Sequence, residues 1–257
     1  MRMCSAELPR VYELVASLKG APKSYFKNFA ASLRDNPIKR KHFVDIEAEL
    51  AALDAAAWDH LKANVGPLFV KGEKIRGWQG AFSELNEAKA YNFLVRRGYT
   101  DVEFIPRRSD TKTPDLRAKM GNVDVLCEVK TINRSKRAIL AQTQMIASSV
   151  SNLLPVEFFS KLASTVRGAD QQMAAFSSAP DMKRIIYLVV NFDDRLHECV
   201  DDYLGQISEK REEFMMPGLE VVLDVKPEFY SATSVSPASH ILSFASGASW
   251  QRPPKID

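Results

Sequence analysis

Apolar residues in the first 75 positions of the chain recur at the spacing of amphipathic helices. Three segments carry this pattern, at residues 7–20, 23–35 and 44–65, and Gly20, Pro37 and Gly66-Pro67 separate them. The basic run Lys39 to His42 lies between the second and third segments, so the pattern places it in a loop. Such a run suits a solvated loop and a nucleic-acid contact equally well. The pattern predicts a small helical region at residues 1–75.

From residue 77 onward, one long helical pattern gives way to short runs typical of strands. The helix, at 77–98, ends at Gly98 in the position of a C-cap. Strand-like runs follow at 101–107, 114–120 and 123–132, and Gly121-Asn122 joins the last two as a hairpin. These elements predict a helix followed by three sequential strands.

The remaining pattern alternates helices and strands. The expected elements are a helix at 156–176, a strand at 184–192 buried on both faces, a helix at 196–214, a strand at 219–225 and an edge strand at 240–244. This order predicts an α/β (α+β) fold with a central mixed β-sheet flanked by helices. We therefore expect a helical N-terminal region at 1–75, a core at 76–225 and an irregular C-terminal extension at 226–257.

The strand "VDVLCEVKTI", residues 123–132, carries two charges inside an apolar run. Because side chains alternate between the faces of a strand, all the odd positions from Val123 to Val129 are apolar and form a core face. The even face places Glu128 and Lys130 side by side. A half-exposed strand with an ion pair at its rim explains this pattern, whereas a buried unpaired charge would cost several kcal/mol.

The preceding strand supplies a second carboxylate. Pro114 and Asp115 stand at its entrance, and the hairpin lets Asp115 approach Glu128. Two adjacent carboxylates repel each other unless a cation lies between them, and magnesium accepts hard oxygen ligands of this kind. Lys130 would orient or help deprotonate the attacking water and stabilise charge in the transition state. The set predicts a site for phosphodiester hydrolysis.

The motif Pro114-Asp115, twelve intervening residues and Glu128-Val129-Lys130 resembles the PD-(D/E)XK nuclease superfamily. The resemblance covers about residues 77–192 and implies a restriction-endonuclease-like core of helix, three-stranded meander, helix and strand. It implies a metal-dependent nuclease in which Asp115, Glu128 and the carbonyl of Val129 bind Mg²⁺, with Mn²⁺ as a substitute. DNA is the expected substrate, and RNA is the alternative.

The superfamily often adds a glutamate on the first helix, in the pattern E-x2-A-x3-L-x3-G. Glu87, Ala90, Leu94 and Gly98 fit this spacing. The resemblance therefore implies that Glu87 contributes to the metal site, with Glu84 as the alternative. It also suggests that a polar residue of the next helix faces the site; the candidates are Gln171 and Gln172.

The charge distribution is basic around these residues. Between Arg76 and Arg137 the sequence contains 13 Lys and Arg against 8 Asp and Glu, within a chain of net charge +3. Candidate contacts to a nucleic-acid backbone are Arg107, Arg108, Lys112, Arg117, Arg134, Lys136 and Arg137. An alternative function is a nucleic-acid-binding or assembly module that uses the same fold without cleavage.

Other features of the sequence narrow the class of protein. The N-terminal residues lack the apolar run of a secretory signal, and no run reaches the length of a membrane span. We expect a soluble, intracellular (cytoplasmic) protein with no membrane partner; a homodimer or a complex with a partner protein is compatible. Cys4, Cys127 and Cys199 lie far apart, so neither a disulfide framework nor a zinc site is indicated.

Overall fold

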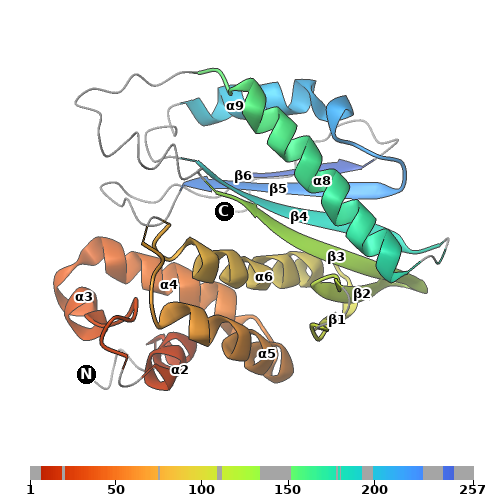
Figure 1. The fold of residues 1–257 in the computed structure, drawn as a ribbon. Coiled ribbons are helices and arrows are strands. Elements are labelled where there is room, and N and C mark those ends of the chain that lie inside the picture. Colours follow the sequence, from red (N-terminus) through yellow and green to blue (C-terminus); the bar gives the residue numbers. More distant parts are fainter. Residues whose placement is uncertain are drawn as a thin grey trace. The chain divides into compact units, whose positions relative to one another are not determined.

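The chain forms two compact units. The structure, a computed structural model, describes residues 7–18, 21–74, 76–108, 112–133, 152–177, 179, 181–192, 199–227 and 240–245. A helical unit contains the described residues up to Phe93, and a sheet unit contains those from Leu94 onward. The expected helical region at 1–75 falls within the helical unit. Figure 1 shows the elements of both units, coloured along the sequence.

Short helices build the helical unit. They are α2 (Pro9–Ser17), α3 (Phe29–Asp35), α4 (Pro37–Ala51), α5 (Ala55–Val65), the 3-10 helix η1 (Gly66–Phe69) and the first part of α6 (Gln79–Arg96). Two caps set their limits: Asn36 accepts a hydrogen bond from the Lys39 N–H at the start of α4, and Asp54 accepts one from the Ala57 N–H at the start of α5.

These caps correct two predictions. The expected helix at 44–65 is two helices, because α4 ends at Ala51 and Asp54 caps the start of α5. The basic run Lys39 to His42 was expected in a loop but lies in the first turns of α4. The physical reason is the Asn36-Pro37 pair, since Asn is a good N-cap and Pro is favoured at the first helical position.

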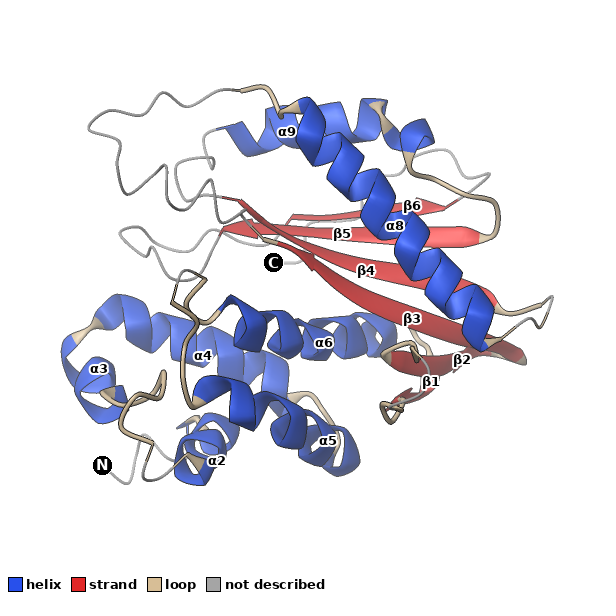
Figure 2. Cartoon of the chain, in the orientation of Figure 1, coloured by secondary structure: helices blue, strands red, loops and turns tan. Residues whose placement is uncertain are grey.

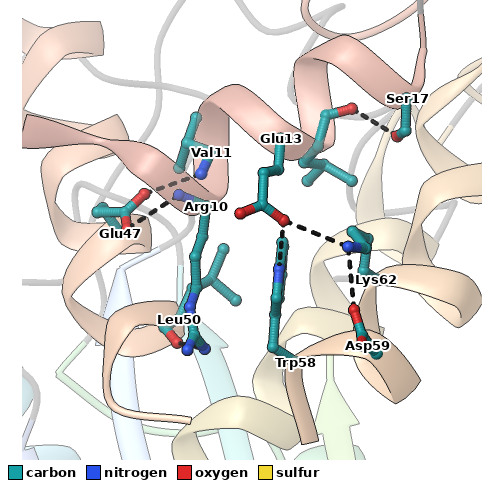
Figure 3. A network of polar contacts seen from close by, with 10 residues as sticks. Arg10, Val11, Glu13, Ser17, Glu47, Leu50, Trp58, Asp59 and Lys62 are labelled. Atoms are coloured by element: carbon teal, nitrogen blue, oxygen red, sulfur yellow. Dashed lines mark hydrogen bonds and ion pairs between the residues drawn. The ribbon is translucent and has the colours of Figure 1, made fainter. Parts of the chain in front are cut away.

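A buried carboxylate ties α2 to α4. Glu47, 5% exposed, accepts hydrogen bonds from the N–H groups of Arg10 at 3.2 Å and Val11 at 2.8 Å (Figure 3). These N–H groups belong to the first turn of α2, which has no side-chain cap of its own. On the other side of α2, Glu13 accepts from the Trp58 indole N–H at 2.8 Å. Glu47 of α4 thus supplies acceptors for the open N–H groups of α2, and Trp58 of α5 holds the same helix through Glu13.

The sheet unit contains a mixed sheet. Its described strands are β1 (Thr100–Phe104), β2 (Leu116–Met120), β3 (Val123–Ile132), β4 (Lys183–Phe192), β5 (Leu219–Pro227) and β6 (His240–Ala245). They lie in the order β1-β2-β3-β4-β5-β6. The pairs β3–β4 and β4–β5 are parallel and the other neighbours are antiparallel (Figure 2). The predicted element order, including the edge strand near 240–244, is confirmed.

The turn between β2 and β3 depends on glycine. Met120 pairs with Val123, so Gly121 and Asn122 are the two central residues of the turn. Gly121 has φ +59°, and Asn122 has a negative φ. This combination fits a type II′ turn, in which glycine occupies the first central position. The hairpin was predicted from these two residues, and it fixes the register on which the position of Asp115 depends.

Two helices cover one face of the sheet. Apolar residues of α8 (Val156–Phe176) and α9 (Val200–Glu209) form one core with β4 and β5, and both helices lie on the same side of the strands (Figure 1). Residues 185–190 of β4 are all buried, as expected for a strand covered on both faces. Leu126 and Ile132 of β3 belong to the same core. The even face of β3 is therefore also buried where these residues lie, whereas Val123, which was expected on the core face, is 40% exposed at the start of the strand.

The sheet unit is thus mixed α/β, with its sheet flanked by helices, as predicted. The restriction-endonuclease-like identity of this core stays a prediction. Among the described helices, none is long and apolar enough to cross a membrane.

Candidate active site

Asp115 lies where β3 extends beyond the end of β2. The pair Leu116–Cys127 is the last in the β2–β3 register, whereas β3 continues to Ile132. The Asp115 carboxylate accepts a hydrogen bond from the Val129 N–H at 2.7 Å, and so replaces the backbone partner that β2 no longer provides. The Asp115 carbonyl accepts from the Ile105 N–H at 2.9 Å. Backbone contacts on both sides therefore fix this carboxylate against β3.

Glu128 is buried on the face of β3 that α8 covers. Its side chain is 1% exposed, whereas an ordinary half-exposed strand would leave this carboxylate partly in solvent. Lys130 donates a hydrogen bond to Oε1 of Glu128, and Gln172 of α8 donates to Oε2 at 2.9 Å. The side chain of Lys130 remains 35% exposed. One buried carboxylate thus connects a cationic group that reaches solvent with an amide from the covering helix.

Gln172 has a second contact that fixes its orientation. Its side-chain amide also donates to the carbonyl oxygen of Thr113 at 2.7 Å. Thr113 is 8% exposed and lies two residues before Asp115. The same amide therefore links the segment that carries one carboxylate to the side chain of the other.

Burial and charge raise the pKa of Glu128 to about 7. Burial is the largest cause and the negative charge of Asp115 is the second, while Lys130 and Gln172 act in the opposite direction. Burial, followed by the charges of the same two carboxylates, raises the pKa of the Cys127 thiol. Asp115 and Glu128 are therefore close enough to destabilise each other as anions, and an additional cation between them would relieve that repulsion.

The donor atoms suit a hard divalent cation. Asp115 and Glu128 offer carboxylate oxygens, each of which can accept more than the one hydrogen bond described above. Magnesium is commonly bound by one or two carboxylates while it keeps several waters. In the described residues, no group of three or more histidine, cysteine or carboxylate side chains is placed to hold an ion. Asp115 and Glu128 thus have the ligand chemistry that magnesium accepts, and their role as metal ligands stays a prediction.

The helix carboxylates lie in the other unit. Glu87 is 6% exposed and Glu84 is half-buried, and both belong to the part of α6 that precedes Leu94. The contribution of Glu87, or of Glu84, stays a prediction.

The predicted nucleic-acid contacts are partly described. Arg107, Arg108, Lys112 and Arg117 are exposed. Arg117 pairs across the hairpin with Leu126, which places it on the same sheet face as Glu128, although its guanidinium also bonds to Glu103 at 2.6 Å. The other predicted contacts, Arg134, Lys136 and Arg137, lie outside the described residues.

Sequence reasoning left two features of the site open. It offered Gln171 and Gln172 equally, and only Gln172 reaches Glu128, whereas Gln171 is exposed. The two residues flank the apolar stripe of α8 on opposite sides, so only the packing of the helix decides between them. The role of the Thr113 carbonyl was missed, because a backbone acceptor leaves no signal in the residue type.

No family model matches this chain, and no curated protein is significantly similar to it. The bond of Asp115 to the Val129 N–H and the bonds of Lys130 and Gln172 to Glu128 are therefore the basis for a functional assignment.

Proposed function

We propose that this protein is a metal-dependent nuclease that hydrolyses phosphodiester bonds. The observation that carries the proposal is the convergence of two carboxylates and a lysine at the end of the β2–β3 ladder. Asp115 bonds to the backbone of Val129, and Lys130 bonds to Glu128, which is buried with a pKa of about 7. A buried structural ion pair is weak evidence for stability, because desolvation offsets its attraction. Strongly perturbed carboxylates of this kind are more typical of functional sites.

The residues divide the work of hydrolysis among them. Asp115 and Glu128 would hold a Mg²⁺ or Mn²⁺ ion, with the carbonyl of Val129 as a further ligand implied by the resemblance to PD-(D/E)XK nucleases. When bound, such an ion would supply Lewis-acid stabilisation of charge on the phosphoryl group.

Lys130 provides N–H donors at the solvent-exposed edge of the site. There it would orient the attacking water and stabilise negative charge that develops on the phosphoryl oxygens. Gln172, which contacts both Glu128 and Thr113, would position Glu128 through the two hydrogen bonds that it donates.

The substrate class follows from charge. Exposed Arg107, Arg108 and Lys112 lie in the segment that leads to Asp115, and cations so placed favour a polyanion with regularly spaced phosphates. DNA is the proposed substrate. Matched DNA and RNA duplexes in competition would identify RNA as the substrate if the RNA duplex were cleaved faster.

The test is cleavage of plasmid DNA and labelled oligonucleotides in the presence of Mg²⁺ or Mn²⁺. We expect nicking by the wild-type protein, and a loss of at least about a hundredfold in rate for Lys130→Ala and for Asp115→Ala. Lys119→Ala is the matched control, because Lys119 is an exposed lysine on the neighbouring strand β2 with a side chain 51% exposed. It should cleave at the wild-type rate.

Two outcomes would contradict the proposal. If cleavage survives in both Lys130→Ala and Asp115→Ala, it arises from another site or from a contaminating enzyme. If the wild-type protein binds DNA in a salt-sensitive manner but gives no metal-dependent product, the alternative of a binding or assembly module replaces that of a nuclease.

A further inference from the structure

One row of residues on α8 follows β3 beyond the candidate site. Residues spaced three or four apart lie in one row along a helix. The row that we call the β3 flank of α8 consists of Lys161, Thr165, Gly168 and Gln172. Both of its ends contact the β3 segment: Gln172 donates to the Glu128 carboxylate at 2.9 Å, and Lys161 donates to the Asn133 carbonyl at 3.0 Å. The two contacts fix how this flank lies along the strand.

The distances along the helix and the strand agree. Lys161 and Gln172 are 11 residues apart in α8, which corresponds to about 17 Å. Glu128 and Asn133 are 5 residues apart in extended chain, which also corresponds to about 17 Å. The helix therefore runs along the strand in the opposite direction. Lys130 lies about 7 Å from Glu128 along β3, so the flank residue level with it is Gly168, four residues before Gln172.

The β3 flank lies toward the side of the sheet on which β2 has ended. The last pair of the β2–β3 ladder is Leu116–Cys127, before the part of β3 that the flank follows. On the other side of the apolar stripe of α8, Asp170 pairs with Arg184 of β4 at 2.7 Å. One side of the helix therefore faces β4, and the β3 flank faces the edge at which the candidate site lies.

Gly168 leaves open space beside the site. Glycine in the interior of a helix lowers its stability relative to alanine, and it is favoured where φ is positive or where another group approaches the backbone closely. Gly168 is exposed and has no positive φ. A Cβ atom at this position would meet no atom of the described residues within 4 Å. Packing within the described part of the chain therefore gives no reason for glycine here.

Lys161 places a cationic group at the far end of the same flank. Its bond to the Asn133 carbonyl fixes the ammonium at the end of β3, and a carbonyl is neutral, so this bond leaves the charge in place. A lysine ammonium has three N–H donors. A donor that is already positioned loses less conformational entropy when it binds a phosphate. Half-buried Thr165, between Lys161 and Gly168, adds a hydroxyl to the row.

We propose that the β3 flank of α8 holds the nucleic-acid strand beside the site of cleavage. Lys161 binds a phosphate that neighbours the scissile one, and Gly168 leaves room for the sugar-phosphate backbone to pass next to Lys130. The side chain of Lys130 is 35% exposed, so the site is open to solvent at this level of the strand. The proposal rests on the proposed function for the identity of the bound polymer.

The first test removes the charge of Lys161 and keeps a hydrogen-bond donor. In Lys161→Gln, titrated as the full chain in EDTA with a short fluorescent DNA duplex, the slope of log K against log salt should fall in magnitude by about 1. In Mg²⁺, KM for cleavage should rise about fivefold while kcat stays within about twofold of wild type, because only binding is affected. Arg167→Gln is the control, since Arg167 is an exposed cation on the other side of α8. It should keep the wild-type slope and KM.

The second test fills the space beside Gly168. Gly168→Leu should bind the same duplex about tenfold or more weakly, because the new side chain clashes with the strand. Gly205→Leu is the matched control: Gly205 is an exposed glycine inside α9, and a Cβ there also meets no atom of the described residues within 4 Å. Gly205→Leu should bind as wild type. Neither substitution should lower the thermal midpoint, because both side chains enter open space.

Each contrary outcome overturns the proposal. A Lys161→Gln protein with the wild-type slope and KM would show that this lysine contacts only the end of β3. A Gly168→Leu protein that binds as tightly as Gly205→Leu would exclude a strand at this position. A lowered thermal midpoint for Gly168→Leu would contradict the open space on which the proposal depends.

The two proposals fail separately. If no condition gives cleavage but Lys161→Gln loses salt slope and Gly168→Leu loses affinity, the nuclease function is wrong and the β3 flank stands as a nucleic-acid contact. If cleavage depends on Lys130 while both variants bind and cleave as wild type, the nuclease stands and the role of the β3 flank is wrong.

Discussion

Replacement of Glu128 by glutamine is expected to stabilise the sheet unit, and to do so more strongly as the pH rises. Glu128 is 1% exposed, and burial followed by the charge of Asp115 raises its pKa to about 7 from an ordinary value of 4.5. The native state therefore binds this proton more tightly than the unfolded state. The stability linked to that proton is complete below pH 4.5 and is lost as the pH rises through about 7.

The size of the effect follows from the shift. A rise from 4.5 to about 7 corresponds to about 3 kcal/mol of unfolding free energy once the pH exceeds 7. Glutamine removes the charge, but its amide N–H group faces the donors Lys130 and Gln172, which costs about 1 kcal/mol. We therefore expect Glu128→Gln to be about 2 kcal/mol more stable than wild type near pH 8, and no more stable near pH 5.

Hydrogen exchange of the β3 and β4 amides, followed by mass spectrometry in EDTA, measures this difference in the sheet unit alone. The matched control is Glu103→Gln, the same substitution at a β1 side chain that is 52% exposed. It should give no gain at either pH. A gain for Glu128→Gln that is equal at both pH values, or larger at the lower one, would refute the assignment of a raised pKa to this carboxylate.

Three further substitutions test local contacts. Gln172→Ala should lower the cleavage rate about tenfold and raise the pKa of Glu128 further, because the hydrogen bond from Gln172 lowers that pKa. The pH dependence of hydrogen exchange measures the change in pKa. The exposed neighbour variant Gln171→Ala should change neither the rate nor the pKa. Glu47→Ala should destabilise the helical unit by about 2 kcal/mol, since two N–H groups of α2 lose their acceptor, and tryptophan fluorescence during urea unfolding reports this. Gly121→Ala should destabilise the hairpin by about 1 kcal/mol, because its φ is +59°; a thermal midpoint equal to wild type would exclude such strain.

Local signals predicted most of the fold. The hairpin followed from Gly121-Asn122, and the doubly buried strand β4 followed from an unbroken apolar run. Both depend on residues near one another in the chain, so the sequence contains the whole signal. The limits of α4 and α5 were missed although their caps are also local, because the apolar pattern runs through Asp54 without a visible break.

The candidate site likewise has one part that local sequence predicts and one part that depends on distant segments. The approach of Asp115 to Glu128 depends only on the hairpin register, which a short turn fixes. The burial of Glu128 depends on α8, which is distant in sequence and covers the even face of β3. Periodicity alone could not show that this face is covered, since charged residues interrupt its apolar pattern.

The sequence by itself therefore determined which residues alternate on each strand, where the hairpin turns and which carboxylates and lysine share a strand end. Only the tertiary structure decided that Glu128 is buried and that Gln172 rather than Gln171 contacts it. The physical reason is range. Turn geometry and strand alternation act over a few residues, whereas desolvation, pKa and the grouping of surface charge depend on which distant segments pack together.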